Sequence, residues 1–267
     1  MITGLIDKTL AIVRRDLLTA IRYRTGFLLT AAGAATELIA FYYLARAIGP
    51  DFRPEGVAYF PFVLVGTGFY TFLVMGTNAF LVTVQEAQQN GTLEVLMTTS
   101  TPPPILIFLS AISSFAGHTI QFLLYLVAGL LLFGAPVHPN LRAGVIIFLL
   151  SLIVALALGV FAAAIQVATQ RGSALIWLLG SGVWFLTGTL FPVATLPRPL
   201  QLLAQAIPIT HSLDGMRAAL LEGASLSALA PTMGVLFLFA LVFLPLSLLA
   251  FSFTVRRART LGTLSFY

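Results

Sequence analysis

Six long apolar runs dominate this sequence, and each is long enough to cross a lipid bilayer as a helix. A hydrocarbon core about 30 Å thick requires about 20 apolar residues in helical form. The runs are Gly26–Ala47, Tyr59–Val84, Ile105–Gly134, Ala143–Ala168, Ala174–Phe191 and Thr232–Val255. They lack strict alternation and far exceed the roughly 10 residues of a barrel strand. The sequence therefore predicts an all-α membrane protein with six transmembrane helices.

The composition excludes the main soluble classes of protein. Only 9% of the 267 residues are charged and 59% are hydrophobic, whereas soluble domains average about a quarter charged residues. A disordered chain would require low hydrophobicity and high charge. The net charge of +5 does not indicate nucleic-acid binding, because the basic residues nowhere cluster into a track for phosphates.

The distribution of basic residues predicts the orientation in the membrane. With both termini on one side, that side carries nine of the 14 Lys and Arg residues, and the other side carries five. Basic residues favour the cytoplasmic side of a membrane protein. We therefore expect a multi-pass protein of the cell membrane with both termini in the cytoplasm.

The chain divides into three parts along its length. Residues 1–25 are expected to form an amphipathic helix on the membrane surface, because apolar residues recur there at helical spacing while arginines lie off that stripe. Residues 26–255 form the six-span domain, and residues 256–267 form a cytoplasmic tail. Two long connections within the domain, residues 85–104 and 192–231, have unusual sequences.

The first connection contains a short apolar segment between chain breakers. Gly91 precedes it and a run of prolines from Pro102 follows it, which brackets a short helix. Leu93, Leu96 and Met97 would stand together in water there. Exposed apolar groups in a compact loop indicate a docking surface for a partner.

The second connection is too apolar for water and too broken to span the membrane. Pro192, Pro197 and Pro208 divide it, and we expect a helix after Pro208 with Thr210 as its N-cap. Asp214 and Arg217 are three residues apart and can pair on one helix face. The segment is therefore predicted to dip into the outer leaflet and return.

Glu37 is the one acidic residue deep inside a predicted span. A charge at that depth costs several kcal/mol unless it is paired or protonated, and any partner must come from another helix. Asn78, Gln121 and Gln166 are polar residues of other spans. These four residues either line a translocation path or form hydrogen bonds that hold the helices together.

No residues for catalysis or metal binding are apparent. His118, His138 and His211 do not have metal-ligand spacing. The only lysine is Lys8, so the chain has no phosphate-binding loop of the Walker type. We expect a non-catalytic protein that binds no metal or cofactor itself.

The pattern as a whole resembles the permease subunit of ABC exporters of the second type, the group that exports drugs, lipids and polysaccharides. Three features carry the resemblance. The first is the order of an amphipathic N-terminal helix and six spans. The second is the motif between spans two and three, formed by Glu86, Gly91, Thr92, Leu93, Glu94, Leu96, Met97 and Pro102. The third is the outer segment with Pro192, Pro197, Pro208 and Arg217.

The resemblance implies a division of labour between chains. In that family the segment between spans two and three is a coupling helix that docks on a separate ATPase, which binds ATP and magnesium. The segment before the last span is re-entrant. Two permease copies, identical or different, enclose the path, so this chain would be half of an exporter embedded in membrane lipids. The alternative is a self-sufficient secondary transporter or channel that uses Glu37.

Overall fold

The computed structural model describes residues 24–90, 103–134, 137–169 and 177–261, which form seven α-helices and no β-strand. Within these residues, five helices are long and apolar enough to cross a membrane. They are α2 (Arg24–Ile48), α3 (Tyr59–Gln89), α5 (Pro103–Phe133), α6 (Leu141–Thr169) and α10 (Leu226–Leu261). The all-α prediction is confirmed, and these helices lie at five of the six predicted positions.

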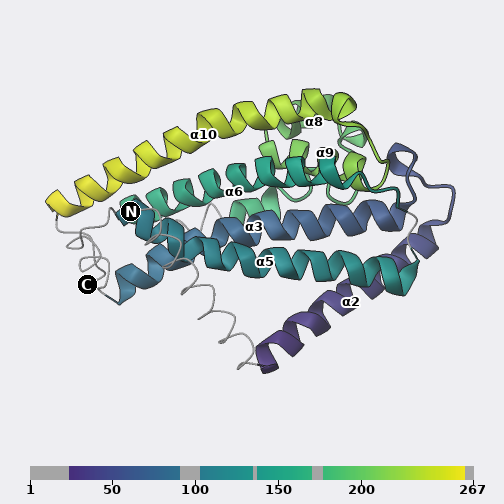
Figure 1. Cartoon of the computed structure of the whole chain (residues 1–267), viewed down its shortest axis with the longest axis horizontal. Helices are drawn as coiled ribbons and strands as arrows, with labels where there is room; N and C mark the ends of the chain where they lie inside the picture. Colours follow the sequence, from purple (N-terminus) through teal and green to yellow (C-terminus); the bar gives the residue numbers. More distant parts are fainter. Residues whose placement is uncertain (1–23, 91–102, 135–136, 170–176, 262–267) are drawn as a thin grey trace.

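Helix α3 is the centre of the bundle (Figure 1). In its most apolar stretch 89% of the residues are buried, against 6% for α2. Close packing around α3 depends on glycine, because a Cβ added at Gly76 would collide with the ring of Phe115 on α5. Phenylalanine rings fill the core beside it, and the ring centres of Phe72 and Phe148 are 5.0 Å apart. Such offset aromatic contacts favour a dense, ordered interior.

Helix α2 lies at the side of the bundle and contacts α3 and α5 along one stripe. Leu38 is buried there, and Ala34, Phe41 and Tyr42 pack against the same core. The three- and four-residue spacing places these side chains on one helix face. The remaining surface of α2 is apolar and exposed, with Leu29 at 75% exposure, as expected for a helix surrounded by lipid.

The fifth predicted span, Ala174–Phe191, is not a long helix in the part of it that the structure describes. That part contains a π-helical turn, η2 (Leu178–Gly182), and a chain reversal at Gly188, whose φ is +76°. The prediction of six spanning helices is therefore not confirmed. Helices α6 and α10 lie side by side and run in the same direction (Figure 1), so the chain between them has to return along the bundle.

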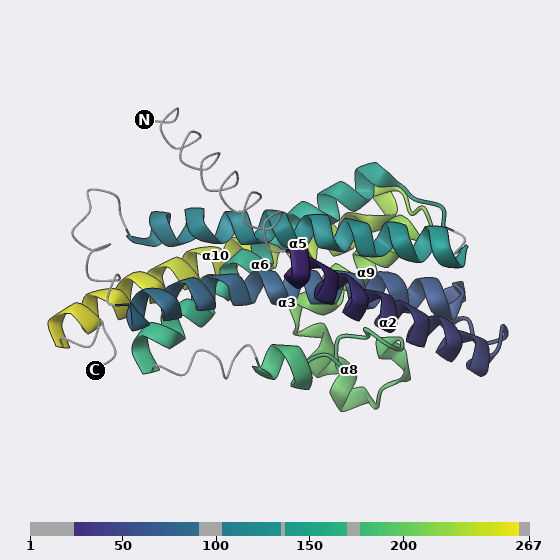
Figure 2. The ribbon, with the colours of Figure 1, turned by 90° about the horizontal axis from the view of Figure 1, so that it is seen from below.

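The outer connection forms three short elements, η3 (Val193–Thr195), α8 (Arg198–Gln205) and α9 (Pro208–Leu220). Figure 2 shows α8 on the side of α3 away from α5. Helix α9 is about 20 Å long at 1.5 Å per residue, too short to cross a bilayer. It packs against α3, α6 and α10.

The predicted N-cap of α9 is wrong. The helix begins at Pro208, with Ile207 as the N-cap and no side-chain capping bond. Proline suits the first helical position because its missing N–H has no partner there in any case. Thr210 lies inside the helix and is buried, and its hydroxyl has no hydrogen-bond partner among the residues that the structure describes.

Candidate functional site

A cavity of about 250 Å³ lies between α2, α3 and α5. Each helix contributes residues at spacings of three and four, so each presents one face to the cavity. Apolar side chains such as Phe72, Met75 and Phe122 form much of the wall. The polar lining residues are Thr30, Glu37, Thr71, His118, Gln121 and Tyr125.

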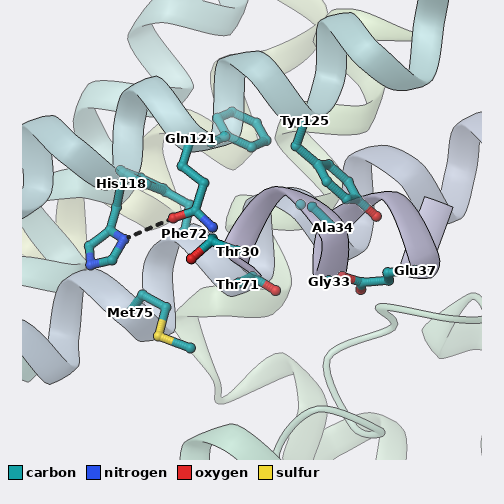
Figure 3. Close-up of a pocket in the computed structure, with 12 residues that line it drawn as sticks. Thr30, Gly33, Ala34, Glu37, Thr71, Phe72, Met75, His118, Gln121 and Tyr125 are labelled. Carbon is teal, nitrogen blue, oxygen red and sulfur yellow. Dashed lines mark hydrogen bonds between the residues drawn. The ribbon is translucent and has the colours of Figure 1, made fainter. Parts of the chain in front are cut away.

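The polar residues separate toward two ends of the cavity (Figure 3). His118 and Gln121 lie together at one end, and the Nδ1–H tautomer of His118 donates a 3.4 Å hydrogen bond to Gln121 Oε1. Glu37 and Tyr125 lie toward the other end. This arrangement follows from the chain direction, since α2 and α5 run the same way along the bundle (Figure 1).

Glu37 is half-buried and forms no hydrogen bond or ion pair that the described residues provide. Among the described residues that line the cavity there is no Arg or Lys. Of the two states expected for Glu37, paired or neutral, the described residues provide no partner for the paired one. Without a partner among the described residues, a carboxyl group at this position would be compensated by a proton or by a cation that enters the cavity.

Tyr125 is held against α3 with its hydroxyl group unbonded. A Cβ added at Gly68 would lie 2.8 Å from Tyr125 Cδ1, so glycine is required for the ring to approach α3. The side chain is 9% exposed, and the part of the chain that the structure describes offers its hydroxyl no hydrogen-bond partner. A buried hydroxyl group without a partner costs about 1–3 kcal/mol. The cavity thus contains an unsatisfied polar group near the unpaired carboxyl of Glu37.

The structure brings together two of the four polar residues predicted for a translocation path. Glu37 and Gln121 line the cavity, whereas Asn78 does not. Gln166 lies on α6 and donates a 3.2 Å hydrogen bond to Gln88 Oε1 on α3. Both glutamines are buried, so Gln166 is one of the side chains that hold helices together.

Sequence reasoning missed four polar residues of the cavity. Thr30, Thr71 and Tyr125 were not singled out, and His118 was considered only as a metal ligand. The signal that could have found them is the spacing of His118, Gln121 and Tyr125, which places three polar side chains on one face of an otherwise apolar helix.

The predicted docking segment lies almost wholly outside the described residues. These do not include Gly91, Thr92, Leu93, Glu94, Leu96, Met97 or Pro102. Helix α3 extends past the predicted end at Val84 to Gln89, so Glu86 lies on its last turn, where it is exposed. The helices on both sides of the segment end and begin at one end of the bundle, where α10 also ends (Figure 1).

In the outer segment Arg217 is fully buried, with 1% exposure. Its Nε donates a 3.2 Å hydrogen bond to the carbonyl oxygen of Phe62, and its Nη2 donates a 2.8 Å bond to that of Thr189. The guanidinium group also lies over the Phe62 ring. Arg217 therefore ties α9 to α3 and to the turn before η3. Of the predicted prolines, Pro192 and Pro208 are buried and Pro197 is exposed.

Asp214 does not form the predicted pair with Arg217, since no hydrogen bond or ion pair joins these two described side chains. It lines an outer pocket of about 380 Å³ together with Glu55, Thr210 and His211. Burial raises the pKa of Asp214 to about 6, although the nearby charge of Arg217 opposes this shift. Burial lowers the pKa of Arg217 to about 10, so the guanidinium remains charged at neutral pH.

The family model described as "ABC-2 family transporter protein" matches residues 46–249. These residues include α3, α5, α6, α8 and α9 and most of α10, but nearly all of α2 precedes them. The search of curated proteins found no match.

Proposed function

Because the chain belongs to the ABC-2 family of transporter proteins and is a multi-pass membrane permease, we propose that it is the membrane subunit of an ATP-driven exporter. Two permease copies would enclose the path, and a separate ATPase chain would bind ATP and magnesium. The family match over most of the chain is the observation that carries this proposal. Six crossings, with both termini in the cytoplasm, complete the proposed topology.

The orientation is supported by charge at one end of the bundle. Arg256, Arg257 and Arg259 are exposed near the end of α10. This is the end at which α3 finishes and α5 starts (Figure 1). A cluster of arginines beside a spanning helix favours the cytoplasmic side. The proposed docking segment would therefore face an ATPase in the cytoplasm.

Helix α3 provides the mechanical link from that segment to the cavity. It is continuous from Tyr59 to Gln89, and Gly68, Thr71, Phe72 and Met75 line the cavity. The distance along the axis from Gln89 to Met75 is about 21 Å at 1.5 Å per residue. A displacement imposed near Gln89 would reach the cavity wall through one rigid helix, because packed elements move as units rather than deform continuously.

Within the segment, we propose that Leu93, Leu96 and Met97 fill a groove on the ATPase. Buried apolar anchors carry most of the binding energy of an interface. Glu86 and Glu94 would orient the two proteins, since charged contacts contribute more to specificity than to affinity.

The test is assembly with the ATPase. The permease and its ATPase are co-expressed and purified through a tag on the permease, and ATP hydrolysis and transport are measured in vesicles. Leu96→Asp should abolish co-purification while the permease remains inserted. Ser225→Asp is the matched control, because it adds the same charge at an exposed outer position where aspartate also caps α10.

Two outcomes would contradict the proposal. Normal assembly of the Leu96→Asp variant would show that this segment does not dock the ATPase. Transport by the permease alone, driven by an ion gradient without ATP, would instead support a secondary transporter that uses Glu37.

A second variant tests coupling. With Glu94→Gln in the permease, the ATPase is expected to retain ATP hydrolysis while transport is reduced.

A further inference from the structure

We propose that the cavity between α2, α3 and α5 binds a small amphipathic organic cation. The protonated amine of the ligand contacts Glu37 and Tyr125, and its apolar part packs against Phe72 and Phe122. This inference rests on the proposed function, since it names the class of molecule that the permease carries or senses.

The charge of the ligand follows from Glu37. Among the described residues that line the cavity, this carboxyl group is the one acidic side chain, and these residues offer it no hydrogen bond or ion pair. In the low dielectric of the membrane, an isolated carboxylate is strongly destabilised and a cation beside it is strongly attracted. A protonated amine supplies both the opposite charge and several N–H donors.

The hydroxyl of Tyr125 provides a second group at the same end of the cavity (Figure 3). It is buried and has no hydrogen-bond partner among the described residues. Its oxygen can accept a hydrogen bond from an ammonium group. One ligand group would therefore satisfy both Tyr125 and Glu37, which the described residues leave unsatisfied.

The remaining wall fits an apolar or aromatic group. The rings of Phe72 and Phe122 stack with their centres 5.8 Å apart, and Met75 lies on the same side of α3 as Phe72. Aromatic faces also attract cations. The volume of about 250 Å³ is somewhat below the range of about 300 to 1,000 Å³ that is usual for small-molecule sites. The cavity thus accommodates a small ligand or the amine end of a longer one.

The acidic wall comes from a part of the chain that the family match does not include. Glu37 and Thr30 precede residue 46, where the matched residues begin, whereas Tyr125 lies within them. The charge preference of the cavity therefore follows from α2 of this chain.

The test measures binding to the purified permease in lipid nanodiscs without any ATPase. The probe is tritiated 4-phenylbutylamine, and the competitor is 4-phenylbutanol, which has nearly the same shape without the charge. We expect saturable binding of the amine, with the alcohol competing at least about tenfold more weakly, which corresponds to about 1.4 kcal/mol. No saturable binding, or equal competition by the alcohol, would overturn the proposal.

Two variants localise the site. Glu37→Gln should weaken amine binding at least about tenfold, and Glu222→Gln is its control because it removes a carboxyl group from an exposed outer position. Gly33→Leu should block binding by filling the cavity, since a Cβ at Gly33 meets no atom within 4 Å. Gly234→Leu is the matched control on α10, where a Cβ also meets open space. Wild-type binding by Glu37→Gln or Gly33→Leu would place the ligand elsewhere.

This test separates the cavity from the proposed function. A permease that assembles with its ATPase but does not bind the amine would refute the assignment of the cavity alone. A permease that binds the amine through Glu37 but never assembles with an ATPase would refute the exporter proposal and retain the cation site.

Discussion

The guanidinium carbon of Arg217 lies 3.6 Å from the centre of the Phe62 ring, and Arg217 Nε donates a hydrogen bond to the carbonyl oxygen of the same Phe62. Both the side chain and the main chain of one α3 residue thus stabilise a buried cation. Carbonyl dipoles and an aromatic face replace an acidic partner, since no ion pair to Arg217 occurs in the described residues.

Replacing Arg217 should destabilise the outer end of the bundle. Arg217→Lys retains the charge but loses the planar fork that donates to two carbonyl groups while stacking on a ring. A hydrogen bond to a charged group contributes about 1.5–3 kcal/mol, and we expect a loss of that size in the free energy of unfolding. Chemical unfolding in detergent measures it, with Arg198→Lys on the exposed α8 as control. Equal stability of wild type and Arg217→Lys would show that these contacts contribute nothing.

Gly66 is required for the same contact. A Cβ at Gly66 would overlap Arg217 Nη2 and lie 2.7 Å from the carbonyl oxygen of Thr189. Gly66→Ala should therefore destabilise the protein, by about 1–3 kcal/mol for overpacking of a core. Gly117→Ala is the matched control on α5, because a Cβ there meets open space, and it should be neutral or stabilising through helix propensity. The melting temperatures of Gly66→Ala and Gly117→Ala are compared. Equal melting temperatures of the two variants would contradict the steric argument.

The buried pair of Gln88 and Gln166 should show coupled mutational effects. Gln166→Leu leaves the Gln88 amide without its donor, which costs about 1–3 kcal/mol for an unsatisfied buried group. Replacing both glutamines with leucine removes both polar groups, so the double variant should be more stable than the single variants suggest. A double-mutant cycle of unfolding free energies tests this. Strictly additive losses would mean that the 3.2 Å hydrogen bond between them does not couple these residues.

The raised pKa of Asp214 predicts that the stability of the protein depends on pH. Burial raises its pKa from an ordinary 3.8 to about 6, so the folded state binds a proton more tightly than the unfolded state. The contribution of Asp214 to the free energy of unfolding is therefore fully present below pH 3.8 and is lost as the pH rises through about 6. The melting temperature of the wild type minus that of Asp214→Asn should decrease as the pH rises from about 4 to about 7. A difference independent of pH would mean that Asp214 titrates normally.

The apolar runs predicted most of the fold because length and hydropathy suffice to specify a helix in lipid. They did not predict the local backbone of Ala174–Phe191, whose described part contains the π-helical turn η2 and a left-handed residue at Gly188. Hydropathy predicts whether a segment is surrounded by lipid or by water, but it does not predict the local backbone conformation. The predicted pairing of Asp214 with Arg217 was wrong for a related reason. Their spacing on one helix does not show that Arg217 instead donates to a main-chain carbonyl group on α3.

The cavity could be predicted only in part. Glu37 and Gln121 stand out as polar residues in apolar runs, but nothing in the sequence shows that α2 lies beside α5 with Glu37 near Tyr125. Tyr125 gives a signal only through its spacing from His118 and Gln121, because a tyrosine in a spanning helix by itself most often indicates an interfacial belt. Its role depends on Gly68, which is distant in sequence and allows the ring to approach α3.

The central position of α3 has a consequence for biogenesis. The ribosome completes α3 before it makes α5, α6 and α9, the later helices that pack against it. At about 5–20 residues per second, the interval from the end of α3 at Gln89 to the end of α9 at Leu220 lasts roughly 7–26 s. During that time the packing surface of α3 faces lipid or the insertion machinery. A nascent chain that stalls before α9 would expose this surface and become a substrate for membrane quality control.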